Sequence, residues 1–159
     1  PPVQDEFSIG YVLDYGPGPI PRQSLNVTIS AQSYRTEIGF ARTFALESEV
    51  QQLRQSGLGL RATALDVLVF GDNGILENQL RAPDECVRHK ILDCVGDFAL
   101  AGCDLRGRFT ALRSGHRLNQ QLIRNLLQHA AREAAAPASP TYSKSRTTSA
   151  AFVPERIAG

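Results

Sequence analysis

The segment from Asp84 to Ala101 most constrains how this chain can fold, because its apolar residues recur at helical spacing. The apolar members are Val87, Ile91, Leu92, Val95, Phe98 and Ala99. Gly102 follows them, and glycine is common just past the end of a helix. Such a helix needs a core to cover its apolar face. The pattern therefore predicts a long helix packed against the main core.

The polar side of this segment carries His89, Asp93 and Asp97 at successive intervals of four residues. At about 100° per residue, the three side chains fall within an arc of roughly 80°. An imidazole and a carboxylate in this arrangement suit a divalent cation such as zinc. The same spacing is also common on solvated helix faces and in ordinary side-chain pairs. Spacing alone leaves both interpretations open.

The rest of the chain alternates between strand and helix patterns. Strands are predicted at residues 7–13, 25–29, 65–70 and 107–112, an extended segment at 41–44, and helices at 30–38, 47–56 and 118–135. Ser30 is the expected cap of the first of these helices, and Asp72-Asn73-Gly74 predicts a hairpin turn. These elements indicate an α+β fold, a two-layer sandwich with one mostly antiparallel β-sheet packed against two or three helices.

Length and composition favour one domain followed by a tail. With 159 residues, of which 42% are hydrophobic, the chain can bury one core but not two ordinary ones. Residues 136–159 are rich in Ala, Ser, Thr and Pro and lack periodicity, which predicts a disordered tail after a domain at 1–135. The chain begins with Pro1-Pro2 and contains no methionine, so we expect a segment of a longer protein.

Charge and hydropathy narrow the possible partners. The net charge is +1, and basic residues are scattered among acidic ones, so no nucleic-acid footprint is predicted. No apolar stretch approaches the roughly 18 residues of a membrane span, and no secretory signal is visible. A cytoplasmic protein without a membrane span is therefore expected.

Four short motifs occur in one order along the chain. They are Ala41-Arg42-Thr43-Phe44, Leu80-Arg81, Arg88-His89-Lys90-x-x-Asp93-x-x-Gly96-Asp97 and Ser114-Gly115-His116-x-Leu118-Asn119. Together they resemble the zinc-dependent UDP-3-O-acyl-N-acetylglucosamine deacetylases of lipid A biosynthesis, specifically their C-terminal domain, over about residues 5 to 130. The resemblance implies hydrolysis of the substrate's N-acetyl amide, with release of acetate. Zinc would assist by polarising the carbonyl and activating water.

The resemblance also implies roles for individual residues. His89 and Asp93 would be zinc ligands. His116 would stabilise the oxyanion or give a proton to the leaving amine, with Asp97 orienting its ring. Thr43 would present its hydroxyl to the tetrahedral intermediate. Taken singly, these residues could equally be a strand-to-helix loop histidine, a solvated helix aspartate and a β-branched strand residue.

Substrate contacts are implied in the same way. Lys90 resembles the lysine that pairs with the nucleotide diphosphate, and Phe44 would contact the sugar. Residues 50–70 correspond to an insert that walls an apolar passage for the acyl chain, with Val50, Leu58, Leu60, Val67 and Val69 as candidates for the wall. The sequence departs from the family at Arg61, which stands where a glycine-rich turn is usual, so the preferred acyl length is open.

One part of the family's machinery has no counterpart in this sequence. The resemblance implies an N-terminal domain that carries a histidine as third zinc ligand, next to a glutamate that acts as general base. No histidine precedes His89, and no Glu-His pair occurs anywhere. We therefore expect this chain to supply about half of an active site and to be inactive alone. The alternative is a catalytically inactive domain of the same fold that binds a nucleotide sugar or a protein.

Overall fold

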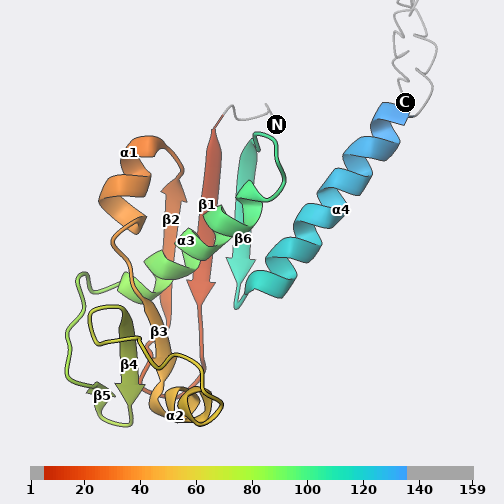
Figure 1. The fold of residues 1–159 in the computed structure, drawn as a ribbon. Helices are drawn as coiled ribbons and strands as arrows, with labels where there is room; N and C mark the ends of the chain where they lie inside the picture. Colours follow the sequence, from red (N-terminus) through yellow and green to blue (C-terminus); the bar gives the residue numbers. More distant parts are fainter. Residues whose placement is uncertain (1–5, 136–159) are drawn as a thin grey trace, which may run out of the picture.

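A computed structural model describes residues 6–135, so the predicted tail at 136–159 lies outside the described residues. The chain forms two three-stranded sheets and several helices (Figure 1). In chain order the elements are β1 (Phe7–Leu13), β2 (Gln23–Thr28), α1 (Ala31–Ser33), the π-helix η1 (Tyr34–Ile38), β3 (Thr43–Leu46), α2 (Glu47–Gln55), β4 (Val67–Gly71), β5 (Gly74–Ile75), α3 (Glu85–Ala99), β6 (Gly107–Leu112) and α4 (His116–Ala135).

The larger sheet has the strand order β2-β1-β6. β1 pairs antiparallel with β2 and parallel with β6, so that Tyr11 lies opposite both Leu25 and Ala111. Helix α3 crosses one face of this sheet (Figure 1). Alternate residues of β1 and one side of α3 fill the core between them: Ile9, Tyr11, Leu13, Val87, Ile91, Cys94 and Phe98. The predicted long helix packed on a core is confirmed.

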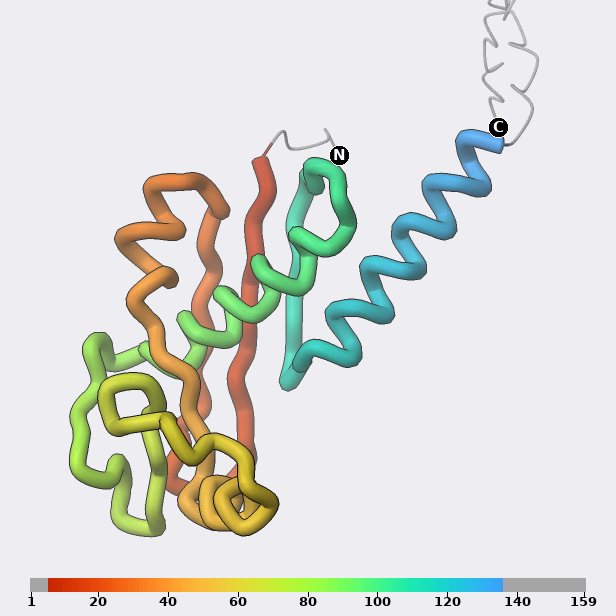
Figure 2. The backbone as a smooth tube through the Cα atoms, in the orientation of Figure 1, coloured from red at the N-terminus to blue at the C-terminus, as the bar shows by residue number. Residues whose placement is uncertain are grey.

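The smaller sheet has the order β3-β4-β5 and lies beyond one end of the larger sheet (Figure 2). β3 and β4 run parallel, and β4 turns back into β5 as a short hairpin. Gly71 lies opposite Gly74, so Asp72 and Asn73 form the two-residue loop. Gly74 has a φ of +114°, which glycine adopts at little steric cost. The predicted hairpin turn is confirmed.

The α+β class is confirmed, but the expectation of one mostly antiparallel sheet is corrected to two mixed sheets. Helix α2 lies between β3 and β4, and a strand-helix-strand connection returns the chain to the same end of the sheet. That geometry makes the two strands parallel. β6 likewise joins β1 in parallel after the chain has passed through α3. Three of the four strand pairings, β1 with β2, β3 with β4 and β4 with β5, still join strands that are consecutive in the sequence, and β1 with β6 joins distant ones.

Helix α4 begins where β6 ends and then runs away from the sheet (Figures 1 and 2). It begins at His116, two residues before the predicted start at 118. Only Asn119 and Ile123 are buried among its residues. Leu118, Leu126 and Leu127 are 41–50% exposed. Exposed apolar side chains that gather on one element commonly mark a surface that contacts another protein segment.

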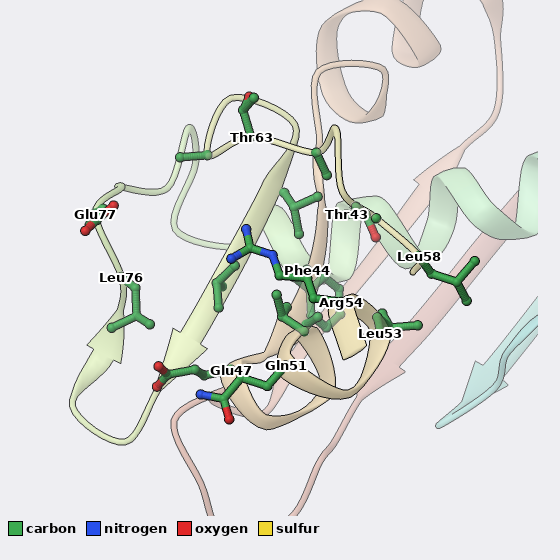
Figure 3. A pocket seen from close by; sticks show the side chains of 17 residues that line it. Thr43, Phe44, Glu47, Gln51, Leu53, Arg54, Leu58, Thr63, Leu76 and Glu77 are labelled. Atoms are coloured by element: carbon green, nitrogen blue, oxygen red, sulfur yellow. The ribbon is translucent and has the colours of Figure 1, made fainter. Parts of the chain in front are cut away.

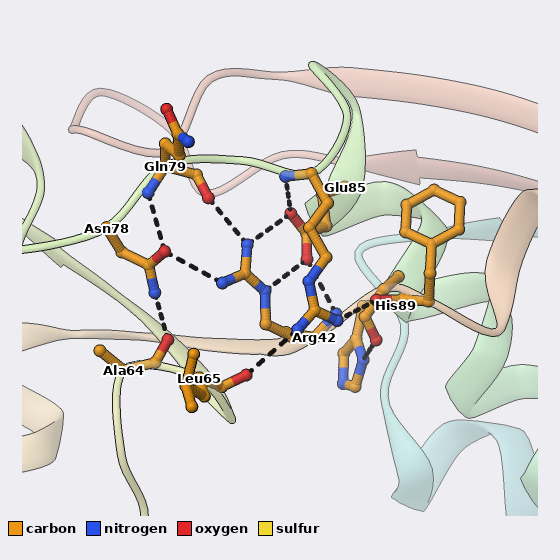
Figure 4. Close-up of polar contacts among 10 residues, drawn as sticks. Arg42, Ala64, Leu65, Asn78, Gln79, Glu85 and His89 are labelled. Carbon is orange, nitrogen blue, oxygen red and sulfur yellow. Dashed lines mark hydrogen bonds and ion pairs between the residues drawn. The ribbon is translucent and has the colours of Figure 1, made fainter.

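A buried ion pair joins the smaller sheet to α3 (Figure 4). Arg42 precedes β3, and Glu85 is the first residue of α3. Arg42 Nε donates to Glu85 Oε1 at 2.8 Å, and Nη2 donates to Oε2 at 3.0 Å. The Arg42 backbone N–H also donates to Oε1, at 3.0 Å. The two side chains are 7% and 0% exposed, so the pair is almost completely removed from water.

Further hydrogen bonds hold the loop before α3 to the same guanidinium. Arg42 Nη1 donates to Asn78 Oδ1 at 3.1 Å, and Nη2 donates to the Gln79 carbonyl at 2.8 Å. Asn78 Nδ2 in turn donates to the Ala64 carbonyl, which lies in the loop between α2 and β4 (Figure 4). Burial of a charged group costs free energy unless all of its donors and acceptors have hydrogen-bond partners. The network therefore fixes three segments around one cation.

We expect Arg42→Met to lower the free energy of unfolding by about 3–5 kcal/mol, because it leaves the Glu85 carboxylate buried without its partner. Arg22→Met is the matched control, since Arg22 is 71% exposed and its Nε lies 3.9 Å from Asp14. The control should lose less than about 1 kcal/mol. Urea unfolding of both variants measures the difference, and similar losses would contradict the prediction.

The same pair makes stability depend on pH. Burial raises the pKa of Glu85, but hydrogen bonds from Arg42 and Arg81 lower it more, so the net pKa lies below the ordinary 4.5. The ionised carboxylate therefore stabilises the fold fully above pH 4.5, and that contribution is lost as the pH falls through the folded-state pKa. The stability difference between wild type and Glu85→Gln should be constant above this value and shrink below it in urea unfolding. A difference that grows on acidification would contradict the assignment.

Candidate active site

His89 and Asp93 lie one turn apart on α3, and their side chains face each other. The Nε2 atom of His89 is 3.3 Å from Oδ1 of Asp93, and the side chains are 17% and 15% exposed. Two tetrahedral ligands that each lie about 2.0–2.1 Å from a zinc ion are about 3.3 Å apart. The separation of the two atoms therefore fits a pair of ligands on one zinc ion.

The hydrogen bonds around this pair leave the required lone pairs available. His89 Nδ1 is 3.2 Å from the Ala41 carbonyl, an acceptor that requires the hydrogen to be on Nδ1 (Figure 4). In the neutral ring, Nε2 then presents a lone pair to Asp93 Oδ1. Two facing lone pairs call for a proton or a metal cation between them. Backbone carbonyls commonly orient metal-binding histidines in this way.

Lys90 contacts the other oxygen of the same carboxylate. Its Nζ donates to Asp93 Oδ2 at 2.6 Å, and its side chain is 17% exposed. The ammonium group therefore balances the charge of Asp93 while leaving Oδ1 directed at His89. The resemblance implies that Lys90 contacts a nucleotide diphosphate, and the ammonium group in the structure donates to Asp93.

The described part of the chain provides an incomplete metal site. Within residues 6–135, no group of three or more His, Cys, Asp or Glu side chains is arranged to hold a metal ion. Catalytic zinc sites generally use three protein ligands and an open position for water. His89 and Asp93 would therefore need a further ligand.

His116 and Asp97 are brought together from different helices. Asp97 lies on α3 one turn beyond Asp93, and His116 is the first residue of α4. His116 Nδ1 lies 3.0 Å from each carboxylate oxygen of Asp97. The His116 side chain is 63% exposed, whereas that of Asp97 is 7% exposed. A buried carboxylate thus holds one side of an exposed imidazole and leaves Nε2 directed away from it.

Two residues behind Asp97 were given no role by sequence reasoning. Asn119 Nδ2 donates to Asp97 Oδ2 at 2.8 Å, and Ser114 Oγ donates to Asn119 Oδ1 at 2.6 Å. One signal was available, since Asn119 stands four residues before Ile123 and so shares its buried face of α4. A polar residue on an apolar helix face calls for a buried hydrogen-bond partner, whereas an apolar residue there is explained by packing alone.

A pocket of about 620 Å³ lies between α2, β3, β4 and the loop that joins α2 to β4 (Figure 3). Thr43, Phe44, Val50, Val67 and Val69 all line it, as does Leu58. Leu60, also predicted to form its wall, is outside the lining and is 70% exposed. Arg61 is likewise outside the lining, although Ala62, Thr63 and Ala64 contribute to it.

Phe44 connects the pocket to the candidate metal pair. Its ring is half-buried in the pocket wall and meets the His89 ring edge-on, with centroids 6.1 Å apart. On its other sides it packs against Tyr15 and Phe70 at 5.9 and 6.5 Å. An apolar pocket and a pair of metal-binding side chains therefore share one aromatic ring as their boundary.

The sequence matches one family over most of its length. The profile described as UDP-3-O-acyl N-acetylglycosamine deacetylase matches residues 1–128. The chain belongs to this deacetylase family. Thr43, His89, Asp93, Asp97 and His116 all fall inside the matched region.

Curated relatives agree with this assignment. The chain is 40% identical over 112 residues to a UDP-3-O-acyl-N-acetylglucosamine deacetylase of Solibacter usitatus, covering 70% of this chain and 38% of the relative. It is 36% identical over 124 residues to the deacetylase of an Anaeromyxobacter species, covering 77% and 41%. For a Psychrobacter species the identity is 38% over 125 residues, covering 77% and 42%. The chain thus spans about two fifths of the length of the curated relatives it matches, and it matches their C-terminal part.

Between residues 6 and 135, no helix combines the length and the apolar character needed to cross a bilayer.

Proposed function

We propose that this chain supplies one half of the active site of a zinc-dependent deacetylase, which removes the N-acetyl group of a UDP-3-O-acyl-N-acetylglucosamine as acetate in lipid A biosynthesis. The observation that carries the proposal is the 3.3 Å separation of His89 Nε2 and Asp93 Oδ1 beside an apolar pocket. A nucleotide sugar is a cytoplasmic metabolite, so we place the reaction in the cytoplasm.

His89 and Asp93 are the proposed zinc ligands in this chain. When bound, zinc would supply a polarised carbonyl and a water of lowered pKa. The Ala41 carbonyl holds the His89 ring in the tautomer that offers Nε2, and Lys90 carries a charge opposite to that of Asp93. These contacts support the role because orienting groups of this kind raise metal affinity about 10–100-fold.

His116 and Thr43 are the proposed contacts to the reacting amide. Asp97 holds the Nδ1 side of His116, so the exposed Nε2 side can donate a proton to the oxyanion or to the leaving amine. Thr43 is exposed at the start of β3 and lines the pocket, so its hydroxyl can reach a group held at the pocket mouth.

The pocket is the proposed site for the 3-O-acyl chain. Val50, Val67 and Val69 line its wall, and Phe44 stands between it and His89, where the sugar would lie. Lys90 is proposed to meet the nucleotide diphosphate, for which it would share its ammonium group between Asp93 and the ligand. Leu60 is exposed outside the wall and would reach the acyl chain only where that chain leaves the pocket.

The remainder of the site is proposed to come from the part of the relatives that this chain does not span. That part would provide the third zinc ligand and the glutamate general base. The exposed leucines of α4, Leu118, Leu126 and Leu127, are the apolar side chains that we expect it to cover.

Zinc titration of this chain tests the metal site. We expect weak binding, and His89→Ala should weaken it by at least about tenfold because one of the two ligands is lost. His129→Ala is the matched control, since His129 is 72% exposed and pairs only with Glu133 among the described contacts. Equal affinities of the two variants in isothermal titration calorimetry would contradict the assignment.

A chimera tests the reaction. The chain is joined to the preceding part of the Solibacter usitatus deacetylase, and acetate release from the UDP-sugar substrate is measured. The chimera should be active, and the isolated chain and the Asp93→Ala chimera should not be. Substrate binding by a folded, zinc-loaded chimera without acetate release would instead support the inactive binding module.

Acyl-chain selectivity tests the pocket. Val69→Phe should narrow it and lower kcat/KM of the chimera for long acyl chains by about tenfold or more, with a smaller effect on short ones. Leu100→Phe is the control, because Leu100 is 71% exposed at the end of α3 and lies outside the pocket lining. Equal effects of the two substitutions across chain lengths would show that the acyl chain lies elsewhere.

A further inference from the structure

Asn119 is the one strongly buried polar residue of α4, with 1% of its surface exposed. Burial of an amide costs free energy unless its donors and acceptor find partners. An apolar residue would suit the same position on the helix face that also carries Ile123. The buried amide therefore needs an explanation other than packing.

Both ends of the Asn119 amide are used. Nδ2 donates to Asp97 Oδ2 at 2.8 Å and lies 3.5 Å from Cys94 Sγ. Oδ1 accepts from Ser114 Oγ at 2.6 Å. The amide thus faces the carboxylate of Asp97 with its donor end, and a hydroxyl group fixes the opposite end in that orientation.

Tyr11 and Cys94, which lie next to this amide, favour the same orientation of Asn119. The Tyr11 hydroxyl donates to the Ser114 carbonyl, and burial raises the pKa of Tyr11, so it remains a donor. Burial also raises the pKa of the Cys94 thiol, to about 12, so no thiolate competes with Asp97 for the amide hydrogens. Tyr11 lies in the centre of β1, which anchors this chain of contacts in the main core.

Asp97 needs a second donor to have a defined orientation. Its two oxygens are equidistant, at 3.0 Å, from a single nitrogen of His116, whose side chain is 63% exposed. The terminal torsion of a carboxylate has a broad energy minimum, so one mobile donor does not fix its plane. The Asn119 amide is buried, is hydrogen-bonded at both ends, and donates to one specific oxygen, Oδ2.

We propose that Asn119 is a positioning residue, which fixes the plane of the Asp97 carboxylate and thereby holds His116 with hydrogen on Nδ1 and a free Nε2. The catalytic consequence rests on the proposed function, but the effect on the imidazole does not. Outer contacts of this kind are typically worth about 10–100-fold in activity when they orient a reacting group.

The tautomer of His116 in this chain is the direct readout. Long-range proton-nitrogen NMR of the nitrogen-15-labelled chain, at a pH where the rings are neutral, resolves signals from its three histidines. In wild type we expect His116 mainly in the Nδ1–H form. In Asn119→Leu that form should fall to about half or less of its wild-type fraction, because the Asp97 carboxylate is free to turn.

Asn125→Leu is the matched control. Asn125 is an exposed residue of the same helix, and the substitution makes the same chemical change. It should leave the His116 tautomer unchanged, and His129 should be unaffected in all variants. An unchanged tautomer in a folded Asn119→Leu chain would overturn the proposal, as would an equal change in Asn125→Leu.

A second variant keeps the proposal testable if Asn119→Leu does not fold. Ser114→Ala removes only the hydroxyl that holds Asn119 Oδ1, so the amide is held less firmly in the orientation that directs Nδ2 at Asp97. We expect a smaller loss of the Nδ1–H form of His116 in this variant. No loss in a folded Ser114→Ala chain would overturn the proposal.

The active chimera provides the catalytic readout. Asn119→Leu should lower kcat by about 10–100-fold while KM and bound zinc stay at the unsubstituted values. Unchanged kcat would overturn the positioning role. An inactive parent chimera would count against the proposed function alone, because the NMR result on this chain decides the role of Asn119 independently.

Discussion

The buried pair of Arg42 and Glu85 is the interaction on which the rest of the arrangement depends. It joins the residue before β3 to the first residue of α3, which lies 43 residues further along the chain. Thr43 and Phe44 follow Arg42 directly, and His89 lies one turn beyond Glu85. A single desolvated contact therefore sets the distance between the pocket and the candidate metal pair. Its rigidity comes from the cost of separating two charges that water cannot reach.

Helix α3 carries the anchoring Glu85 and the candidate site residues along one side. Glu85, His89, Asp93 and Asp97 recur every four residues, so they follow one side of the helix. The opposite side of α3 is buried against β1, and this packing fixes the positions of the four polar side chains. The first turn anchors the smaller sheet, the next two carry the candidate metal pair, and the last holds an imidazole from α4. A shift of the helix would displace all four side chains together.

The candidate site is partly exposed, and the chain that carries it spans about two fifths of the length of its curated relatives. The His116 imidazole is exposed, and so are three leucines of α4 in the described region. In the proposed function, docking of the remaining part would complete the metal coordination and cover those leucines together. Metal binding and assembly would then be thermodynamically linked, because each stabilises the other.

The sequence by itself determined the features that depend on local periodicity: the amphipathic helix α3 with its polar line, the turn at residues 72–74 and the Ser30 cap, whose hydroxyl accepts from the Ser33 backbone. These follow from backbone geometry over a few residues. Only the tertiary structure decided the parallel pairing of β1 with β6, the exclusion of Leu60 from the pocket wall, and the partners of Arg42 and Asn119. Those depend on contacts between segments far apart in sequence, where periodicity shows which face is buried but not what it is buried against.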